Sequence, residues 1–134
     1  MKKETLKRIF EFLEAKEGHN APVKWKIINN EPLTEEDLNV YGDLDFRFSS
    51  ITSLPEGLNV GRDLDIFGSD ITSLPKGLKV GRFLDIRNTE ITSLSKGLEL
   101  GSSLYIRHTA LVKYSDEELQ DMVKPGFIDG RIHR

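Results

Sequence analysis

Charged side chains recur at a constant interval in the middle of this chain. Asp45, Asp65 and Asp85 form one series, and Arg47, Arg87 and Arg107 belong to a second series two positions further on. A row of carboxylates could bind calcium, but that cation takes about six to eight oxygen ligands from a converging loop, which such a row does not supply. We therefore favour mutual neutralisation of the two series over a cation site.

Other reactive groups do not form a recognisable catalytic set. His19, His108 and His133 share no metal-ligand spacing, and the chain has no cysteine. The Ser and Thr residues of the ITSL segments recur once per repeat, which indicates a structural role. The glycines lie at turns and not in a phosphate-binding loop between a strand and a helix. We expect no enzymatic activity and no cofactor.

The composition limits the class of partner. The chain has 134 residues, a formal net charge of −3 and a pI of about 5.6. A general nucleic-acid binder needs a strong basic excess, so nucleic acid is an unlikely partner, although Arg62, Arg82, Arg87 and Arg107 keep it as a weak alternative. No segment approaches the ~20 apolar residues of a membrane span. These features favour a cytoplasmic protein without membrane association.

The charged series belongs to a longer repeat. Four copies of one phrase begin at Leu38, Leu58, Leu78 and Leu98, and the second reads LNVGRDLDIFGSDITSLPKG. A fixed period of this length predicts a solenoid, in which each coil is too small to bury its own apolar face and stacks on its neighbours.

Alternation within each copy predicts one short strand per coil. Leu64 and Ile66 alternate with Asp63, Asp65 and Phe67, which is typical of a strand with one buried face. Repeated strands of one direction then form one parallel sheet, and extended or 3₁₀ backbone covers the ITSLP segment. The predicted inward positions are Leu44, Phe46, Ile51, Leu54, Leu64, Ile66, Ile71, Leu74, Leu84, Ile86, Ile91, Leu94, Leu104, Ile106 and Leu111.

The pattern LDI-xx-T-x-I-xx-L-P-xx-L resembles the leucine-rich repeat in its shortest, bacterial form, over residues 38 to about 114. The resemblance implies an α/β solenoid of about four coils with one parallel sheet, and a binding role like that of bacterial effectors. Two positions depart from the family pattern. Gly61, Gly81 and Gly101 replace its first leucine, and Ser49, Ser69, Thr89 and Thr109 replace its asparagine ladder. We expect these hydroxyls to bond to neighbouring coils.

We expect the chain to be a single domain over residues 1–134, with a cap at 1–37, the repeats at 38–114 and a second cap at 115–134. Apolar spacing predicts a helix over 3–16 that ends at Gly18; a cap is favoured over a membrane-surface role for it. The segment VKWKII at 23–28 alternates and predicts a strand. Ser115 and Glu118 predict a capping box for a final helix, after which FIDGRI predicts a returning strand.

The outward side chains of the coils form the candidate site. Phe67, Phe83 and Tyr105 are aromatic where water favours polar groups, and aromatics together with arginine are enriched at protein interfaces. We expect a protein partner of unknown identity, such as a host protein inhibited by an effector; homodimerisation is the alternative. We also expect Phe67 and Arg87 to be dispensable for stability. The predicted partner-binding residues are Asp45, Arg47, Asp65, Phe67, Phe83, Asp85, Arg87, Tyr105 and Arg107.

Overall fold

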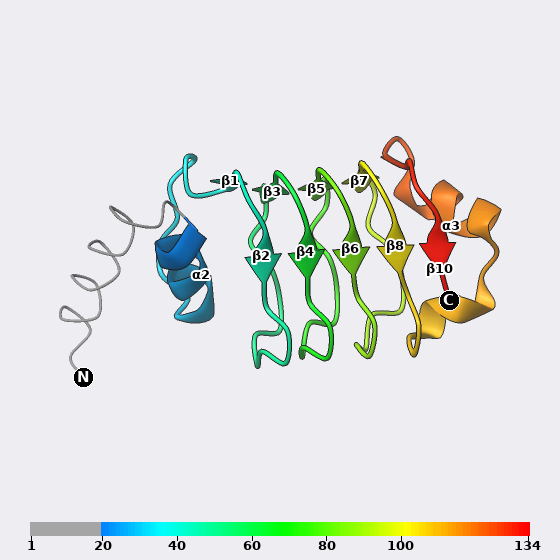
Figure 1. The fold of residues 1–134 in the computed structure, drawn as a ribbon, viewed down its shortest axis with the longest axis horizontal. Coiled ribbons are helices and arrows are strands. Elements are labelled where there is room, and N and C mark those ends of the chain that lie inside the picture. The colour runs from blue at the N-terminus through cyan, green and yellow to red at the C-terminus, as the bar shows by residue number, and fades with distance from the viewer. Residues whose placement is uncertain (1–19) are drawn as a thin grey trace.

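The chain forms a small β-solenoid with coils of about 20 residues, in a computed structural model that describes residues 20–134. Two parallel five-stranded sheets run along the solenoid and meet at a corner (Figure 1). Sheet A contains β1 (Asn39–Val40), β3 (Asn59–Val60), β5 (Lys79–Val80), β7 (Glu99–Leu100) and β9 (Phe127–Ile128). Sheet B contains β2 (Leu44–Asp45), β4 (Leu64–Asp65), β6 (Leu84–Asp85), β8 (Leu104–Tyr105) and β10 (Ile132–His133).

The strand register confirms that residues one repeat apart become lateral neighbours. Asp45 pairs with Asp65, Asp65 with Asp85, and Asp85 with Tyr105. The last strand of each sheet breaks the period, because β9 and β10 come from the C-terminal segment and pair with β7 and β8. The predicted stacking of the repeats is therefore correct, and the C-terminal segment adds a fifth strand to both sheets.

The prediction of one sheet is wrong, because each coil contributes two short strands. The second strand lies just before the glycine corner, where Leu58 and Val60 are buried and Asn59 between them is not. Because this alternation covers so few positions, it is easily read as part of a turn. Asn59 also donates a side-chain hydrogen bond of 3.0 Å to Asn39 across sheet A.

The hydrophobic core is one continuous column through the coils. The residues predicted to point inward are buried, except Ile51, which is half-buried and packs against the core. Leu64, Leu84 and Leu104 are fully buried one above the other. Each coil thus adds one apolar layer, as expected for a solenoid.

Glycines at the corner allow neighbouring coils to approach closely. A Cβ placed on Gly81 would lie 2.1 Å from the carbonyl oxygen of Gly61, and one on Gly101 would lie 2.1 Å from that of Gly81. The first repeat has Tyr41 at this position, and no earlier repeat packs against it there. The replacement of leucine by glycine therefore reflects contact between backbones.

The buried hydroxyl column bonds within its own coils and not between coils as expected. Thr89 and Thr109 donate to the carbonyl oxygens of Ile86 and Ile106, at 2.7 and 2.6 Å. Ser69 accepts from the Ile71 N–H at 3.4 Å. Each hydroxyl lies over the turn that ends its own strand, so the neighbouring coil is not its partner.

The N-terminal end differs from its prediction. The helix predicted over 3–16 lies outside the described residues. The segment predicted as a strand is part of helix α2 (Asn20–Ile28). Val23 and Ile27 stand one helical turn apart, so a helix also directs both toward the core, and alternation in so short a run does not separate the two conformations.

The C-terminal end carries the predicted helix and a cap for sheet A. After the 3₁₀ helix η1 (Ala110–Lys113), α3 (Asp116–Val123) begins with the predicted capping box of Ser115 and Glu118. The Gln120 amide donates to the Ile128 carbonyl oxygen at 2.7 Å and accepts from the Ile128 N–H at 3.1 Å. A side chain thereby satisfies the edge of β9, which would otherwise offer these groups to another strand.

Among residues 20–134, the helices are too short and too polar to span a lipid bilayer.

Candidate functional site

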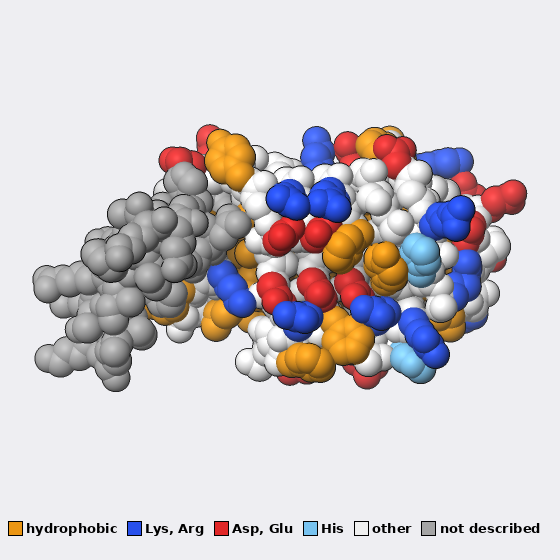
Figure 2. Space-filling view, viewed as in Figure 1, with side chains coloured by type: hydrophobic (Ala, Val, Ile, Leu, Met, Phe, Trp, Pro, Cys, Tyr) orange, Lys and Arg blue, Asp and Glu red, His pale blue; other side chains and the backbone are white. Residues whose placement is uncertain are grey.

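The outer face of sheet B collects the residues predicted to bind a partner. Figure 2 shows acidic side chains over the N-terminal strands of this sheet, with aromatic side chains beside them and basic ones toward the C-terminal end. The register brings together one row that includes His133 of β10, which the sequence analysis did not assign to this face. The row is Asp45, Asp65, Asp85, Tyr105 and His133.

The aspartates of this row have a structural role. Oδ1 of Asp45, Asp65 and Asp85 each accepts a hydrogen bond of 3.0 Å from the backbone N–H two residues later. Such bonds hold the chain as it turns away from the strand end. The recurrence of aspartate therefore has a local explanation that needs no ligand.

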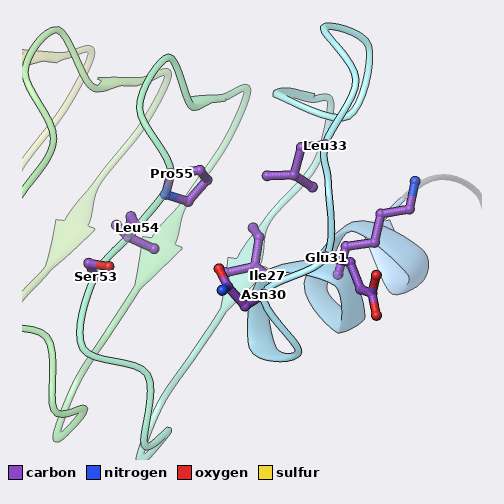
Figure 3. Close-up of a pocket in the computed structure, with 8 residues that line it drawn as sticks. Ile27, Asn30, Glu31, Leu33, Ser53, Leu54 and Pro55 are labelled. Atoms are coloured by element: carbon purple, nitrogen blue, oxygen red, sulfur yellow. The ribbon is translucent and has the colours of Figure 1, made fainter. Parts of the chain in front are cut away.

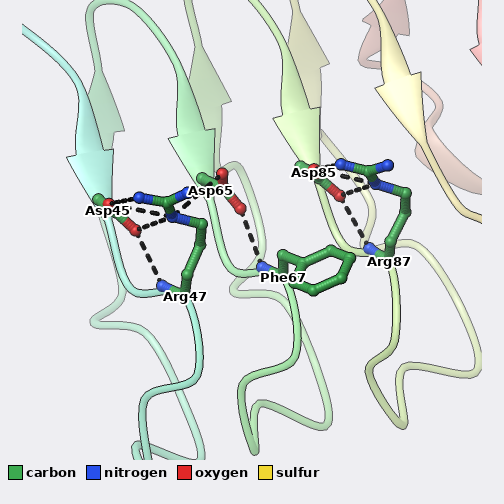
Figure 4. Close-up of polar contacts among 6 residues, drawn as sticks. All are labelled: Asp45, Arg47, Asp65, Phe67, Asp85 and Arg87. Carbon is green, nitrogen blue, oxygen red and sulfur yellow. Dashed lines mark hydrogen bonds and ion pairs between the residues drawn. The ribbon is translucent and has the colours of Figure 1, made fainter.

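Two of the aspartates are also neutralised by arginine, as predicted (Figure 4). Arg47 donates from Nε and Nη2 to Asp45, at 3.1 and 2.9 Å, and Arg87 binds Asp85 in the same way at 3.0 and 2.6 Å. Bidentate pairs of this kind are among the stronger ion pairs in proteins.

The two pairs differ in burial. The side chain of Asp85 is 4% exposed, whereas that of Asp45 is 47% exposed. Burial raises the pKa of Asp45, but the hydrogen bonds and charge of Arg47 outweigh it and hold this pKa below its usual value. The hydrogen bonds that Arg47 and Arg87 donate to the aspartates raise the pKa of both arginines. Arg87 thus compensates a buried charge, and Arg47 an exposed one.

Asp65 has no arginine on its own strand, because Phe67 occupies that position (Figure 4). The closest arginine contact of its carboxylate is Arg47 Nε, 3.8 Å from Oδ2. Burial raises the pKa of Asp65, the Phe67 N–H hydrogen bond opposes this, and the charges of Asp85 and Asp45 raise it further. Asp65 is therefore the least compensated carboxylate of the row.

Asparagine substitutions should separate these environments. Asp45→Asn is expected to lower the free energy of unfolding at pH 7 by about 0.5 kcal/mol, as an exposed ion pair is lost. Since the folded-state pKa of Asp45 is lowered, this stabilisation is present above the unfolded pKa and disappears as pH falls through the lowered value. Asp65→Asn should instead leave stability unchanged or raise it at pH 7, because its raised pKa disfavours the charged form in the folded protein.

Urea titrations of both variants and of the wild-type protein at pH 7 and at acidic pH measure these differences. Asparagine keeps an Oδ1 acceptor for the backbone N–H, so the two substitutions are matched. A larger stability loss at pH 7 from Asp65→Asn than from Asp45→Asn would contradict the interpretation.

Aromatic rings surround the central arginine. The Arg87 guanidinium carbon lies 5.1 Å from the centre of the Phe67 ring and 5.6 Å from that of Tyr105, on the strands at either side. Phe83 and Tyr105 meet edge to face at 5.5 Å, and Tyr105 stacks on His133 at 4.6 Å. We call Phe67, Phe83, Arg87, Tyr105 and His133 the aromatic–arginine cluster.

Phe48 lies at the edge of this cluster and is 74% exposed. Its ring meets that of Phe67 at 5.4 Å, and its φ of 56° lies in the left-handed region, which is unfavourable for a bulky residue. The other coils have Gly68, Asn88 and His108 at this position, residue types that adopt this conformation more readily. A hollow of about 230 Å³ is lined by Arg47, Phe48, Asp65, Phe67 and Arg87.

The last predicted binding residue, Arg107, is exposed and follows Tyr105 where the earlier coils have aspartate. The second hollow of this face, of about 180 Å³, lies toward the N-terminal strands. It is lined by Asp43, Leu44, Asp45, Arg47, Asp63, Asp65 and Phe83. All nine residues predicted to bind a partner therefore lie on one face, although the aspartates and Arg87 also hold it together.

A further hollow lies between α2 and the first coil (Figure 3). Its volume is about 100 Å³, enough for only a few water molecules, and side chains of the helix, the following loop and the first ITSLP segment converge on it. Within residues 20–134, no three histidine, aspartate or glutamate residues are grouped so that they could hold a metal ion. The outer face of sheet B remains the candidate site.

Comparison with known proteins adds no assignment: no protein-family model, curated protein or solved structure matches the chain.

Proposed function

We propose that the protein is a non-enzymatic protein-binding module, and that the outer face of sheet B is its binding surface. The observation that carries the proposal is the aromatic–arginine cluster with exposed Phe48 beside it. Aromatic residues and arginine supply most of the energy in typical interfaces. They lie here on or close to the short strands of a regular sheet, so little ordering is needed when a partner docks.

The position of Phe48 supports this assignment. An apolar ring that is 74% exposed gains little from the fold, and its left-handed backbone costs free energy. The ring forms one wall of the hollow that also contains Asp65 and Arg47. A partner side chain inserted there would bury the ring and meet charged groups of both signs.

The likeness of the coils to leucine-rich repeats belongs to the same proposal. With it we propose an intracellular setting, in which the protein acts as an effector or inhibitor on a host protein. The absence of cysteine is compatible with a reducing compartment.

Phe48→Gly is the sharpest test of the surface. Glycine accepts the left-handed backbone, as Gly68 does in the next coil, so we expect stability to be unchanged or slightly higher. Loss of the ring should weaken partner binding by at least about tenfold, as is common when an aromatic anchor is removed from an interface. Affinity capture from the native source, followed by titration of the captured partner by calorimetry, measures the loss.

Val112→Gly is not a suitable control, because it changes the backbone of η1. Val112→Ala is better, since Val112 is also exposed, at 42%, but belongs to η1 and not to a strand of sheet B. Equal binding by wild type and Phe48→Gly, with Val112→Ala as the reference, would remove this face as the binding surface.

A further inference from the structure

Negative charge prevails at the N-terminal end of the outer face of sheet B, and positive charge prevails at its C-terminal end. We infer that this face pairs with the same face of a second copy of the chain. The inference rests on the proposed function in its choice of binding surface, and it assigns that surface to a second copy of the chain in place of a host protein. In Figure 2 acidic side chains gather over β2, β4 and β6, and basic side chains and a histidine follow toward the C-terminal end of the face.

A count for each strand makes the division clear. The face residues of β2 and of β4 each carry one net negative charge, and those of β6, β8 and β10 each carry one net positive charge with histidine neutral. Arg62 and Arg82 are included because each lies 3.8 Å from an aspartate of the face. The charged residues, strand by strand, are Asp43, Asp45 and Arg47; Arg62, Asp63 and Asp65; Arg82, Asp85 and Arg87; Arg107; and Arg131.

Such a face is complementary to itself when one copy is reversed. A twofold axis along β6, the central strand, places β2 opposite β10 of the second copy and β4 opposite β8. A twofold interface of this kind makes every contact twice. Asp43 then faces Arg131 of the second copy, and Phe83 faces its own counterpart near the axis.

Asp65 and Arg107 are the residues that this arrangement completes. The other four aspartates of the face each have an arginine of their own within 3.8 Å, whereas the arginine that lies 3.8 Å from Asp65 is Arg47, which already binds Asp45 at 2.9 Å. Two residues before Arg107 the chain has Tyr105, at the position where the other coils have an aspartate. In the twofold arrangement Arg107 of the second copy lies opposite Phe67, two residues beyond Asp65. Arg47 likewise stands two residues beyond Asp45 and binds its carboxylate, so Arg107 of the second copy would stand in the corresponding position for Asp65.

The size of the face sets the strength of the pairing. Five strands about 4.8 Å apart, with three outward rows, cover a few hundred Å² on each copy, less than the ~800 Å² of a standard interface. We therefore expect a reversible monomer–dimer equilibrium that depends on protein concentration and weakens with salt.

Charge reversal tests the arrangement without knowledge of any other partner. One variant carries Asp43→Lys and Asp65→Lys, and a second carries Arg107→Glu and Arg131→Glu. Phe83 and Tyr105 occupy the same rows as the two aspartates, so these rows accept side chains without a carboxylate. Circular dichroism checks that each variant is folded, and sedimentation equilibrium from about 10 µM to about 1 mM gives its mass, a range suited to weak contacts.

We expect wild type to dimerise, each variant to be monomeric alone, and an equimolar mixture of the two variants to recover the dimer. The mixture restores every opposite-charge pair, and only contacts between chains can explain that recovery. The control Lys76→Glu with Lys96→Glu makes the same change in net charge as the second variant, at exposed loop positions, and should dimerise like wild type. Asp65→Asn, which keeps the backbone hydrogen bond, should weaken the dimer if the lysine variant does not fold.

Monomeric wild type throughout this range, dimerisation of either variant alone to the wild-type extent, or a monomeric mixture would overturn the inference. The proposed function is tested separately: a monomer that captures another protein in a Phe48-dependent manner disproves the second copy as the partner and leaves the binding surface in place.

Discussion

Arg87→Ala is expected to lower the free energy of unfolding by about 3 kcal/mol, because it leaves the buried carboxylate of Asp85 without its counter-charge. The side chain of Asp85 is only 4% exposed, and its Oδ2 lies 2.6 Å from Arg87 Nη2. Removal of the guanidinium also removes its contacts with the rings of Phe67 and Tyr105. A urea titration followed by circular dichroism measures the loss.

Arg47→Ala is the matched control for this prediction. It breaks the same bidentate geometry, but Asp45 is 47% exposed and can be solvated by water, so the expected loss is clearly smaller than that from Arg87→Ala. Asp85→Asn in the Arg87→Ala background should restore part of the stability, since no buried charge then remains. Similar losses from the two arginine variants would show that burial of Asp85 is not what makes Arg87 important.

This expectation revises the prediction that Phe67 and Arg87 serve binding alone. Arg87 belongs to the proposed binding surface and also neutralises the buried carboxylate of Asp85, so its removal cannot test binding by itself. Phe48 and Arg107 are exposed and are better probes of the surface.

Gly81→Ala should be at least as damaging, with a loss on the order of 3 kcal/mol. The added Cβ would lie 2.1 Å from the Gly61 carbonyl oxygen, and that atom belongs to backbone that cannot rotate away. To relieve the contact, the second and third coils must separate at the corner. The hydrogen bond from the Gly81 N–H to the Val60 carbonyl oxygen, now 2.8 Å, would then lengthen.

Gly77→Ala is the control for this prediction. It tests the cost of a positive φ without any contact between backbones. Gly77 has a φ of 71° but no atom within 4 Å of an added Cβ, so its substitution should cost only about 1–2 kcal/mol. Thermal unfolding of the two variants compares the costs. If Gly81→Ala is the milder of the two, the coils are not held together by contact between backbones at this corner.

The repeat frame was the part of the fold that could be predicted best. The constant period of the four copies and the alternation around Leu64 and Ile66 were enough to predict the register, the inward residues and the rows of outward side chains. Sheet A was missed because its strands are so short that they leave almost no periodic signal. The strand predicted at 23–28 failed for a related reason, since Val23 and Ile27 suit one face of a helix as well as alternate positions of a strand.

The candidate site was predicted in position but not in detail. Asp45, Asp65 and Asp85 stand in nearly identical local sequences, and yet one is exposed, one lacks an arginine on its strand and one is buried. The missing arginine beside Asp65 is visible in the sequence as Phe67, but the differences in burial come from side chains on neighbouring strands, which lie a full repeat away along the chain. The position of His133 beside Tyr105 depends on the path of the C-terminal segment, which no repeat pattern indicates.

The equivalence of successive coils also bears on how such a protein changes over generations. Because the second and third repeats present similar surfaces to their neighbours, an in-frame duplication of one repeat unit can be accommodated without redesign of either end. Recombination between tandem copies in the gene would create or remove such units, each adding or subtracting about 4.8 Å of length. With an even number of strands in sheet B, the twofold axis of the proposed dimer would fall between two strands and place different residues opposite each other, so a change of length would alter the proposed self-pairing.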